Sequence, residues 1–225
     1  MTSSQHQPIR VAIVGGSGKV ARQIITQLRA RRDDAVAIFR NPDRFDELAE
    51  LGAIPIALDV ETATVEQLAA VLVGADAVVF SAGAGGGDPA RTRSVDFDGA
   101  VKTLEATRAA GVRRFVMVSA IHAGGPIPVD EDNSMFVYYQ AKHDADVEVE
   151  ASGLNWTILR PGSLTDDAAT GRFTVGDTVP DGSVSRADVA AAVIAAIDDP
   201  RTVGHAWELT NGDRSIVEAV AELVD

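Results

Sequence analysis

Short runs of apolar, mostly β-branched residues recur along the first 160 residues, and segments with helical spacing separate them. Strands that are apolar at every position are buried on both faces, which is typical of a parallel sheet with helices on each side. A regular alternation of strand and helix builds βαβ units that wind right-handed into an open sheet. The pattern therefore predicts an α/β fold with a doubly wound parallel sheet. Its expected strands are residues 9–14, 35–39, 54–58, 77–80, 114–118 and 156–159.

The alternation weakens after residue 162. Residues 163–183 are polar, acidic and interrupted by glycine. One amphipathic helix over 184–197, a short strand near 206–209 and a helix over 215–223 are expected to close the chain. We therefore expect a single domain over residues 1–225, in which the sheet is complete by residue 160. Residues 163–225 would form a small cap on the substrate side.

Composition limits the classes of function that are open to the chain. Its 225 residues are 46% hydrophobic and 24% charged, as in an ordinary globular protein. The formal net charge of −13 argues against nucleic acid as a partner, because a polyphosphate needs clustered cations. Cysteine is absent and the four histidines are scattered, so no metal site is expected. No apolar run of about 18 residues and no secretory leader is visible, so we expect no membrane contact and a cytoplasmic location.

The first expected strand runs directly into the sequence GGSGKVA at residues 15–21, and a helix follows. In this spacing Gly15 permits the tight turn, Gly18 lets the backbone approach a pyrophosphate, and Ala21 lets the helix pack closely on the strand. Free N–H groups at the start of the helix then bind phosphate oxygens. A plain strand–helix turn is the alternative, but this position in the chain favours a Rossmann-type dinucleotide site. The loop residues expected to contact the cofactor are Gly15, Ser17, Gly18, Lys19 and Val20.

Arginine stands at the end of the second expected strand, where a site that prefers NAD usually has an acidic residue for the ribose 2′-hydroxyl. The guanidinium of Arg40 can bind a 2′-phosphate with two hydrogen bonds, and Arg44 could add a second cation. The alternative is two solvated arginines at a strand end. This position favours NADP(H) over NAD(H) as the cofactor.

With these features in view, the chain resembles the atypical short-chain dehydrogenase/reductase proteins. More narrowly, it is similar to small NAD(P)H-binding proteins that are often labelled NAD(P)-dependent epimerases or dehydratases. The resemblance spans nearly the whole chain, and several matched segments in the right order are more specific than one motif. The matching segments are GGSGKVA (15–21), RNP (40–42), LDV (58–60), FSAG (80–83), VDFDG (95–99), FVMVS (115–119), YYQAK (138–142) and ILRPG (158–162).

The resemblance implies roles for individual residues. Asp59 and Val60 would face the adenine, and Pro161 would border the nicotinamide. A catalytic trio would consist of Ser119, Tyr138 and Lys142. Standard members complete a tetrad with Asn, whereas VDFDG places Asp96 at the matching position, a departure that bears on the proton relay. The residues implied to line the cofactor between its ribose and phosphates are Ser81, Ala82 and Gly83.

The residue chemistry can also be considered without the family. Tyr138 and Lys142 are four residues apart, so on a helix they share one face, while Tyr139 is turned away. An ammonium near a phenol stabilises the phenolate, so we expect Lys142 to lower the pKa of Tyr138. Tyr138 could then exchange a proton with a substrate oxygen, to which Ser119 could also donate a hydrogen bond. Alternatively, the pair only packs on the helix, or Lys142 only holds the nicotinamide ribose.

Three functions remain open at this stage. The leading hypothesis is an NADP(H)-dependent oxidoreductase that transfers hydride to or from a small carbonyl, quinone or similar acceptor. A sugar-nucleotide epimerase or dehydratase is the second enzyme hypothesis, although the segment after Lys142 is short and lacks clustered cations for a diphosphate. The third is a non-catalytic NADPH-binding sensor or interaction protein, which Asp96 keeps open. The expected partner is a small-molecule substrate, and a homodimer through helices on one sheet face is plausible.

Overall fold

An eight-stranded sheet forms the centre of the protein in a computed structural model that describes residues 7–85 and 88–224. The strand order is β3-β2-β1-β4-β5-β6-β10-β8, and only β8 runs antiparallel to its neighbour within this sheet. The order of the first six strands is that of a doubly wound dinucleotide-binding sheet, so the predicted fold class is confirmed. The strands are β1 (Arg10–Val14), β2 (Asp34–Phe39), β3 (Ile54–Ala57), β4 (Ala77–Phe80), β5 (Arg114–Val118), β6 (Asn155–Pro161), β10 (His205–Asn211) and β8 (Phe173–Gly176).

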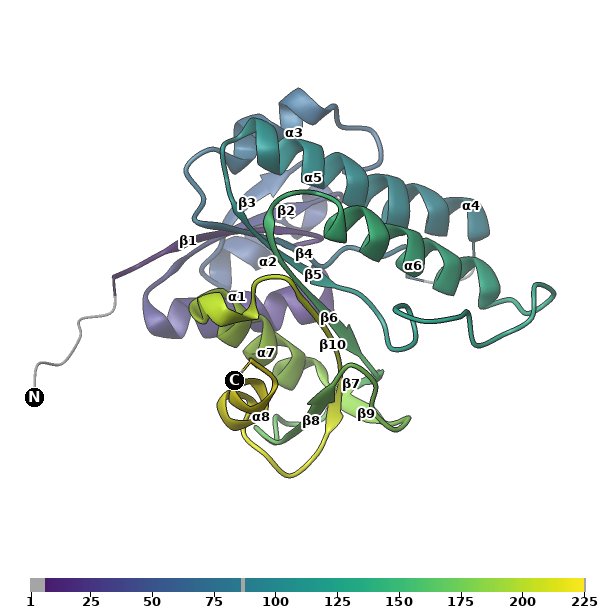
Figure 1. The fold of residues 1–225 in the computed structure, drawn as a ribbon. Coiled ribbons are helices and arrows are strands. Elements are labelled where there is room, and N and C mark those ends of the chain that lie inside the picture. The colour runs from purple at the N-terminus through teal and green to yellow at the C-terminus, as the bar shows by residue number, and fades with distance from the viewer. Residues whose placement is uncertain (1–6, 86–87, 225) are drawn as a thin grey trace, which may run out of the picture.

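Helices cover both faces of the sheet (Figure 1). On one face α1 (Lys19–Arg31) packs against α7 (Arg186–Asp198), and on the other lie α3 (Val65–Leu72), α5 (Gly99–Ala109) and α6 (Phe136–Glu150). The shorter elements are η1 (Pro42–Arg44), α2 (Phe45–Glu50), α4 (Pro89–Thr92), the π-helical turn η2 (Arg93–Asp98), η3 (Pro200–Thr202) and α8 (Ile216–Val224).

Strand β1 shows why its sequence is apolar at every position. Val11 and Ile13 pack into the layer under α1 and α7, whereas Ala12 and Val14 pack into the layer under α3 and α5. All four side chains are almost fully buried. Burying a valine or isoleucine side chain stabilises the fold by about 1.5–3 kcal/mol, so a polar residue on either face of this strand would be costly.

The C-terminal part of the chain departs from the expectation. A strand, a helix before it and a helix after it form as predicted, but β10 and β8 extend the main sheet beyond β6. The expectation that the sheet ends near residue 160 is therefore wrong. The reason is that β10 contains the buried polar residue Glu208, which accepts hydrogen bonds from the backbone N–H groups of His122 and Val179. A strand with such a residue lacks the apolar pattern of the others.

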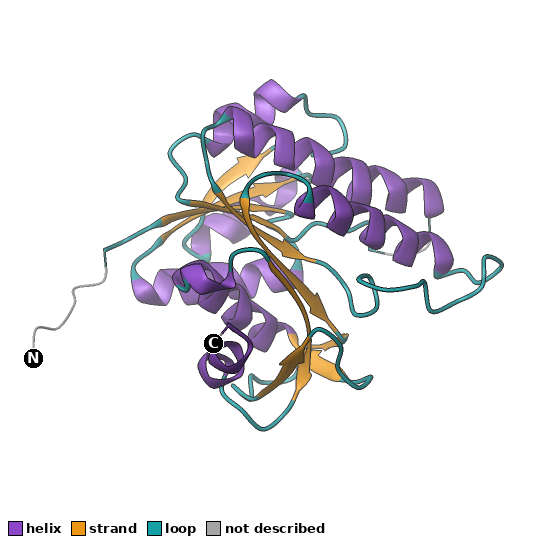
Figure 2. Cartoon of the chain, viewed as in Figure 1, coloured by secondary structure: helices purple, strands orange, loops and turns teal. Residues whose placement is uncertain are grey.

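Two short strands of residues 163–225 form a second sheet of their own. Strands β7 (Ser163–Thr165) and β9 (Ser183–Ser185) pair in parallel as a separate two-stranded sheet. Figure 2 shows these short strands beside the end of the main sheet. Their position next to the carboxyl ends of the central strands brings Leu164 and Arg186 to the cleft described below. Within the part of the chain that the structure describes, no helix is long and apolar enough to cross a membrane.

Candidate active site

The glycine loop lies between β1 and α1, at the carboxyl edge of the sheet. Gly15 has φ of +87°, and a Cβ atom on it would lie 2.6 Å from backbone atoms of Ala82. Gly18 is the N-cap residue of α1, and among the described residues no side chain caps this helix and no acidic residue occupies its first turn. The free N–H groups at the start of α1 therefore suit a phosphate group, and the loop fits the pyrophosphate of a dinucleotide.

Two adjoining clefts open at this edge. The larger, the Tyr138 cleft, has a volume of about 650 Å³ and includes Ser119, Tyr138 and Lys142 in its lining. The smaller, the Arg40 cleft, has a volume of about 220 Å³. Both clefts are lined in part by Gly18 and by the Ser81, Ala82 and Gly83 backbone after β4. A dinucleotide that spans the glycine loop can therefore place one end in each cleft.

Lys142 is tied to Asp96 inside the Tyr138 cleft. The ammonium nitrogen lies 2.9 Å from Oδ1 of Asp96, and the two side chains are only 5% and 2% exposed. The other carboxylate oxygen, Oδ2, accepts a hydrogen bond from the Ala84 N–H at 2.9 Å. Asp96 thus fixes Lys142 on α6 and at the same time holds the loop after β4. A buried ammonium requires such a partner, because a single desolvated charge is strongly unfavourable.

Tyr138 lies one helical turn before Lys142 on α6, as the spacing predicted, and the ammonium is 5.9 Å from the centre of the phenol ring. Burial raises the pKa of Tyr138; Lys142 opposes this, but Asp96 adds to the rise, and the net direction is upward. The expected net lowering of this pKa is therefore wrong. The physical reason is that the phenol is largely desolvated and that Asp96 offsets the charge of Lys142.

The ionisation of Lys142 follows from the same contacts. Burial lowers the pKa of Lys142, but the Asp96 carboxylate and the other nearby acidic groups outweigh burial and raise it overall. Lys142 therefore stays charged at neutral pH and Tyr138 keeps its proton. Tyr139, which sequence spacing placed on another side of the helix, does not line the Tyr138 cleft as the structure describes it.

Ser119 follows β5 and is 5% exposed. Its Oγ, like Oδ1 of the neighbouring Asp146, has no well-aligned hydrogen-bond partner among the described residues. The hydroxyl lies close enough to the Asp146 carboxylate to lower its pKa, so its one proton can be donated either to this carboxylate or to an oxygen of a ligand. Ser119 thus lies at the wall of the Tyr138 cleft, and its catalytic role stays a prediction.

Asp146 continues the buried face of α6 one turn beyond Lys142. Its Oδ2 accepts a hydrogen bond of 2.8 Å from Nε of Arg160, and Nη2 of the same guanidinium lies 3.5 Å from Oε1 of Glu150. Burial raises the pKa of Asp146, while Arg160 and the hydroxyl of Ser119 lower it, and the net direction is upward. The alternation of acidic residues at 144, 146, 148 and 150 in the sequence suggests a solvated face; for Asp146 this interpretation is wrong, because its side chain is buried, and the i, i+4, i+8 spacing with Tyr138 and Lys142 was the signal for that.

The Arg40 cleft contains two arginines that share one carboxylate. Arg40 lies 3.4 Å and Arg91 3.3 Å from Oε2 of Glu61, and Ser94 donates a 2.7 Å hydrogen bond to Oε1. Burial raises the pKa of Glu61, but Ser94 and the two arginines lower it, and the net direction is downward. Sequence analysis missed Arg91, although it follows the Asp88–Pro89 start of α4.

The remaining predicted residues divide between the two clefts. Asp59, Val60 and Ser17 line the Arg40 cleft, and Lys19 and Val20 line the Tyr138 cleft. Arg44 is not among the described residues that line either cleft, because its guanidinium lies 2.8 Å from Glu47. Pro161 is buried in β6 and is likewise absent from the described lining of both clefts.

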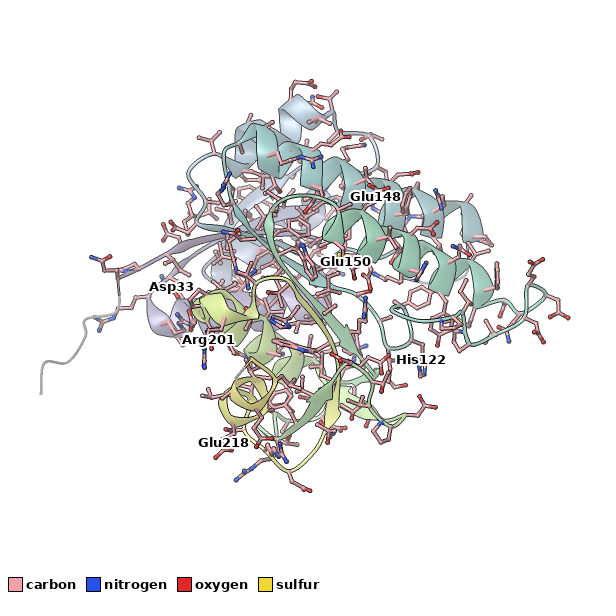
Figure 3. All side chains as sticks on the ribbon, viewed as in Figure 1. Asp33, His122, Glu148, Glu150, Arg201 and Glu218 are labelled. Atoms are coloured by element: carbon pink, nitrogen blue, oxygen red, sulfur yellow. The ribbon has the colours of Figure 1, made fainter. Side chains whose placement is uncertain are left out.

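His122 is not among the described residues that line the Tyr138 cleft. It lies in the loop after β5, labelled in Figure 3, where Nε2 is 2.7 Å from Oδ1 of Asp181. Among the described residues, no group of three histidine, cysteine or acidic side chains could hold a metal ion.

Together, the parallel sheet, the glycine loop with the uncapped helix and the two clefts at its edge define a dinucleotide-binding protein of the Rossmann type. Residues 15–200 match the model of a family described as NAD(P)H-binding. The chain belongs to this NAD(P)H-binding family, which is of the oxidoreductase and epimerase type.

Named relatives agree with this assignment. The chain is 37% identical to a Bacillus subtilis protein named uncharacterized sugar epimerase YhfK, over 96% of this chain and 100% of that protein. A solved structure from Bacillus halodurans, provisionally described as an NAD-dependent epimerase/dehydratase, has a TM-score of 0.87 and 34% identity over 95% of this chain and 99% of that one. The oxidoreductase ylbE from Lactococcus lactis has a TM-score of 0.84 and 29% identity over 96% and 97% of the two chains.

Proposed function

We propose that this protein is an NADP(H)-dependent oxidoreductase that reduces a small carbonyl, quinone or similar acceptor. One observation carries the proposal: Ser119, Tyr138 and Lys142 line a single cleft that begins at the glycine loop. The name of the ylbE relative, an oxidoreductase, supports the same class. A reduced nicotinamide bound across the loop would supply a hydride to the acceptor.

The residues of the chain supply the other requirements of carbonyl reduction. Reduction places a hydride on the carbonyl carbon and a proton on the oxygen. Tyr138 keeps its proton at neutral pH and donates it to this oxygen, while the Ser119 hydroxyl donates a hydrogen bond to the same atom. The ammonium of Lys142, whose charge Asp96 offsets in part, then stabilises the tyrosinate until Tyr138 takes a proton from solvent. Asp96 acts as a positioning residue, because it fixes the ammonium.

The preference for NADP(H) rests on the charges of the Arg40 cleft. Arg40 and Arg91 both approach Glu61, while Asp59, the other acidic residue of the lining, accepts a hydrogen bond from the Glu61 N–H, so two guanidinium groups remain at the cleft for a 2′-phosphate. A guanidinium binds phosphate through two parallel hydrogen bonds, so Arg40 is the proposed contact and Arg91 a second one. If Glu61 instead accepts a hydrogen bond from a ribose 2′-hydroxyl, the cofactor is NAD(H), and the affinities of Arg40→Ala for NADPH and NADH distinguish the two.

The names of two relatives support a second candidate, an epimerase or dehydratase. Such reactions commonly begin with oxidation of a substrate hydroxyl, which requires a tyrosinate as the base. Because the pKa of Tyr138 is raised, little tyrosinate is present at neutral pH, so the base that such an oxidation needs is scarce. Exposed apolar side chains at the mouth of the cleft also suit an apolar acceptor better than a sugar.

The first experiment is NADPH oxidation, followed by absorbance, against a panel of aldehydes, ketones, quinones and flavins. Acceptor-dependent oxidation by the protein, lost in Tyr138→Phe and kept in Tyr139→Phe, is the expected result. Tight NADPH binding without oxidation by any acceptor would contradict the proposal and favour an NADPH-binding sensor. Interconversion of a nucleotide sugar with NAD(P)⁺ bound would favour the epimerase.

A further inference from the structure

An exposed carboxylate joins two cations at the edge of the Tyr138 cleft. Oδ2 of Asp166 lies 2.5 Å from Nζ of Lys19, and Oδ1 lies 2.7 Å from Nη1 of Arg186. Lys19 comes from the start of α1, Arg186 from the start of α7, and Asp166 from the residue after β7. Lys19 and Arg186 line the cleft, whereas Asp166 does not appear in its described lining.

The charges that line this cleft do not balance in pairs. Lys142 is neutralised by Asp96, and Asp88 accepts hydrogen bonds from backbone N–H groups at the start of α4. Lys19 and Arg186 are then the remaining cations of the described lining, and they share the single carboxylate of Asp166. The three side chains Lys19, Asp166 and Arg186 together carry one positive charge, whereas the whole lining with Asp166 is neutral, because Asp88 also contributes a carboxylate. A local excess of positive charge in an acidic protein attracts an anion.

The wall beside these cations is apolar. Met135, Val137 and Leu164 are 43%, 36% and 36% exposed, and all three line the Tyr138 cleft. Large apolar side chains that stay exposed at a cleft indicate an apolar ligand. Leu164 is two residues before Asp166, so the apolar wall and the charged group lie on adjacent parts of the same segment.

We propose that the acceptor of this enzyme has an apolar body and carries a carboxylate, which binds Arg186 and Lys19 in exchange for Asp166. The inference rests on the proposed oxidoreductase function and names its substrate class. The apolar body packs on Met135, Val137 and Leu164, and its reducible carbonyl or quinone oxygen faces Tyr138. The carboxylate replaces the Asp166 side chain at Arg186, where a guanidinium binds it through two hydrogen bonds.

The position of Arg186 distinguishes a substrate anion from a cofactor phosphate. Arg186 lines the Tyr138 cleft and is not among the described residues that line the Arg40 cleft. It follows directly after β9, the partner strand of β7, which carries Leu164. Ser185 caps α7 through a 3.0 Å hydrogen bond from the Asp188 N–H, so Arg186 starts from a fixed backbone. Lys19 belongs to the glycine loop, so Arg186 is the residue to change.

Binding of two unreactive probes to the NADPH-saturated protein tests the inference without turnover. The probes are 2-naphthoate and its uncharged analogue 2-naphthamide, compared by isothermal titration calorimetry. We expect 2-naphthoate to bind at least roughly tenfold more tightly, as a charge-assisted contact would give. Equal affinity for the two probes overturns the inference. So does the absence of 2-naphthoate binding at about 1 mM, because this concentration detects even weak complexes.

Two variants of Arg186 and one of Asp166 test whether Arg186 causes the preference for 2-naphthoate over 2-naphthamide. Arg186→Gln should reduce the ratio of the two affinities to near one, and Arg186→Lys should keep most of it, because the charge remains. Asp166→Asn should strengthen 2-naphthoate binding, because the competing carboxylate is removed. A preference that survives in Arg186→Gln overturns the inference. The affinity of Arg186→Gln for NADPH should change less than about twofold; a loss of roughly tenfold would assign Arg186 to a cofactor phosphate and also overturn it.

Failure of the inference and failure of the proposed function give different results. If 2-naphthoate binds selectively through Arg186 but no acceptor is reduced, the oxidoreductase proposal fails and the site for an apolar anion remains. If neutral aldehydes are reduced and 4-carboxybenzaldehyde gains nothing over benzaldehyde in kcat/KM, the oxidoreductase proposal remains and the carboxylate inference fails. Thermal unfolding of each variant checks that the substitutions leave the fold intact.

Discussion

The ammonium of Lys142 lies 2.9 Å from a carboxylate oxygen of Asp96, and both side chains are almost completely buried. Standard members of the family that the chain resembles have an uncharged asparagine at this place. With Asp96, the ammonium is neutralised where it stands, and its effect on Tyr138 is offset. The pair therefore helps to keep Tyr138 protonated, which is the form that the proposed reduction starts from.

Tyr138→Phe should lower kcat by roughly 10²–10⁴-fold, because it removes the group that donates the proton. The affinity for NADPH should stay within about twofold, since only the hydroxyl is lost. Tyr139→Phe is the matched control, because Tyr139 is the neighbouring tyrosine on α6 and is absent from the described cleft lining. Steady-state NADPH oxidation and fluorescence titration measure the two quantities. An undiminished rate in Tyr138→Phe would remove Tyr138 from the mechanism.

Alkaline pH should destabilise the protein through Tyr138 and Lys142. Their pKa values in the folded chain are raised above the ordinary values of 10.0 and 10.5. Below the ordinary values both groups are protonated whether the chain is folded or unfolded, so their contribution to stability is fully present. As pH rises further, the unfolded chain releases protons first, and the contribution is lost up to the folded pKa values. Each group then lowers the free energy of unfolding by up to about 1.4 kcal/mol per pH unit.

Urea unfolding between about pH 9 and about pH 11 gives the net slope, to which Arg114 adds a contribution of opposite sign, because burial lowers its pKa to about 10; the part that belongs to Tyr138 is therefore taken from the difference between two proteins. Tyr138→Phe should show a shallower decline than the unmodified protein, because one of the two groups no longer titrates. Identical slopes for the two proteins would mean that the pKa of Tyr138 is not raised by folding.

Arg40→Ala should weaken NADPH binding by roughly 1.5–3 kcal/mol, as expected for a hydrogen bond to a charged group. NADH lacks the 2′-phosphate, so its affinity should change little. Arg44→Ala is the control: Arg44 is also an exposed arginine, but it pairs with Glu47 outside the described lining of the Arg40 cleft. Equal losses for NADPH and NADH in Arg40→Ala would show that Arg40 does not bind the 2′-phosphate.

Arg91→Ala tests the second cation of the same cleft. A preferential loss of NADPH affinity would place Arg91 beside Arg40 at the 2′-phosphate. A loss shared by both cofactors would instead reflect the contacts of Arg91 with Glu61 and with the Ala84 carbonyl, which shape the cleft.

Asp96→Asn should move the alkaline limb of the reduction rate to lower pH. The Asp96 carboxylate contributes to the raised pKa of Tyr138, so its removal lowers that pKa and Tyr138 loses its proton earlier as pH rises. A shift of roughly one pH unit in the kcat profile is expected. Lys142 would also be left buried without its partner, at a cost of roughly 3–5 kcal/mol in stability.

The two effects of Asp96→Asn can be separated. Thermal unfolding reports the loss of stability, whereas the pH at half-maximal kcat reports the proton held by Tyr138. A variant that is less stable but keeps the original pH profile would reduce Asp96 to a structural role.

Gly15→Ala should destabilise the protein and weaken NADPH binding together. The φ of +87° costs about 1–2 kcal/mol for a residue with a Cβ, and that Cβ would also lie 2.6 Å from the Ala82 backbone. Gly74→Ala is the matched control, because Gly74 has φ of +79° with no atom within 4 Å of its would-be Cβ among the described residues. Similar losses of Tm in both variants would show that the close approach at Ala82 contributes nothing.

Much of the fold could be predicted because its signals are local. The strand β1 is apolar at every position because it is buried on both faces, and the glycine loop follows it directly in the sequence. The i, i+4 spacing of Tyr138 and Lys142 placed both on one side of α6, and the structure has both in one cleft. The roles of these residues in binding and catalysis remain predictions.

Other features could not be predicted because they depend on residues that are distant in sequence. The strand β10 joins the main sheet although Glu208 interrupts its apolar pattern, since that carboxylate is satisfied by N–H groups of two other loops. Arg91 on α4 meets Glu61, which lies 30 positions earlier in the chain, after the end of β3. Arg44, which looked equivalent to Arg40, turns to Glu47 instead.

The sequence by itself determined the α/β class, the order of the first elements and the position of the dinucleotide loop, because periodicity and turn chemistry act between neighbouring residues. Only the tertiary structure decided that Asp96 pairs with Lys142, and that the pKa of Tyr138 rises although a lysine lies one turn away. A pKa depends on burial and on every charge nearby, and both are set by how distant segments pack.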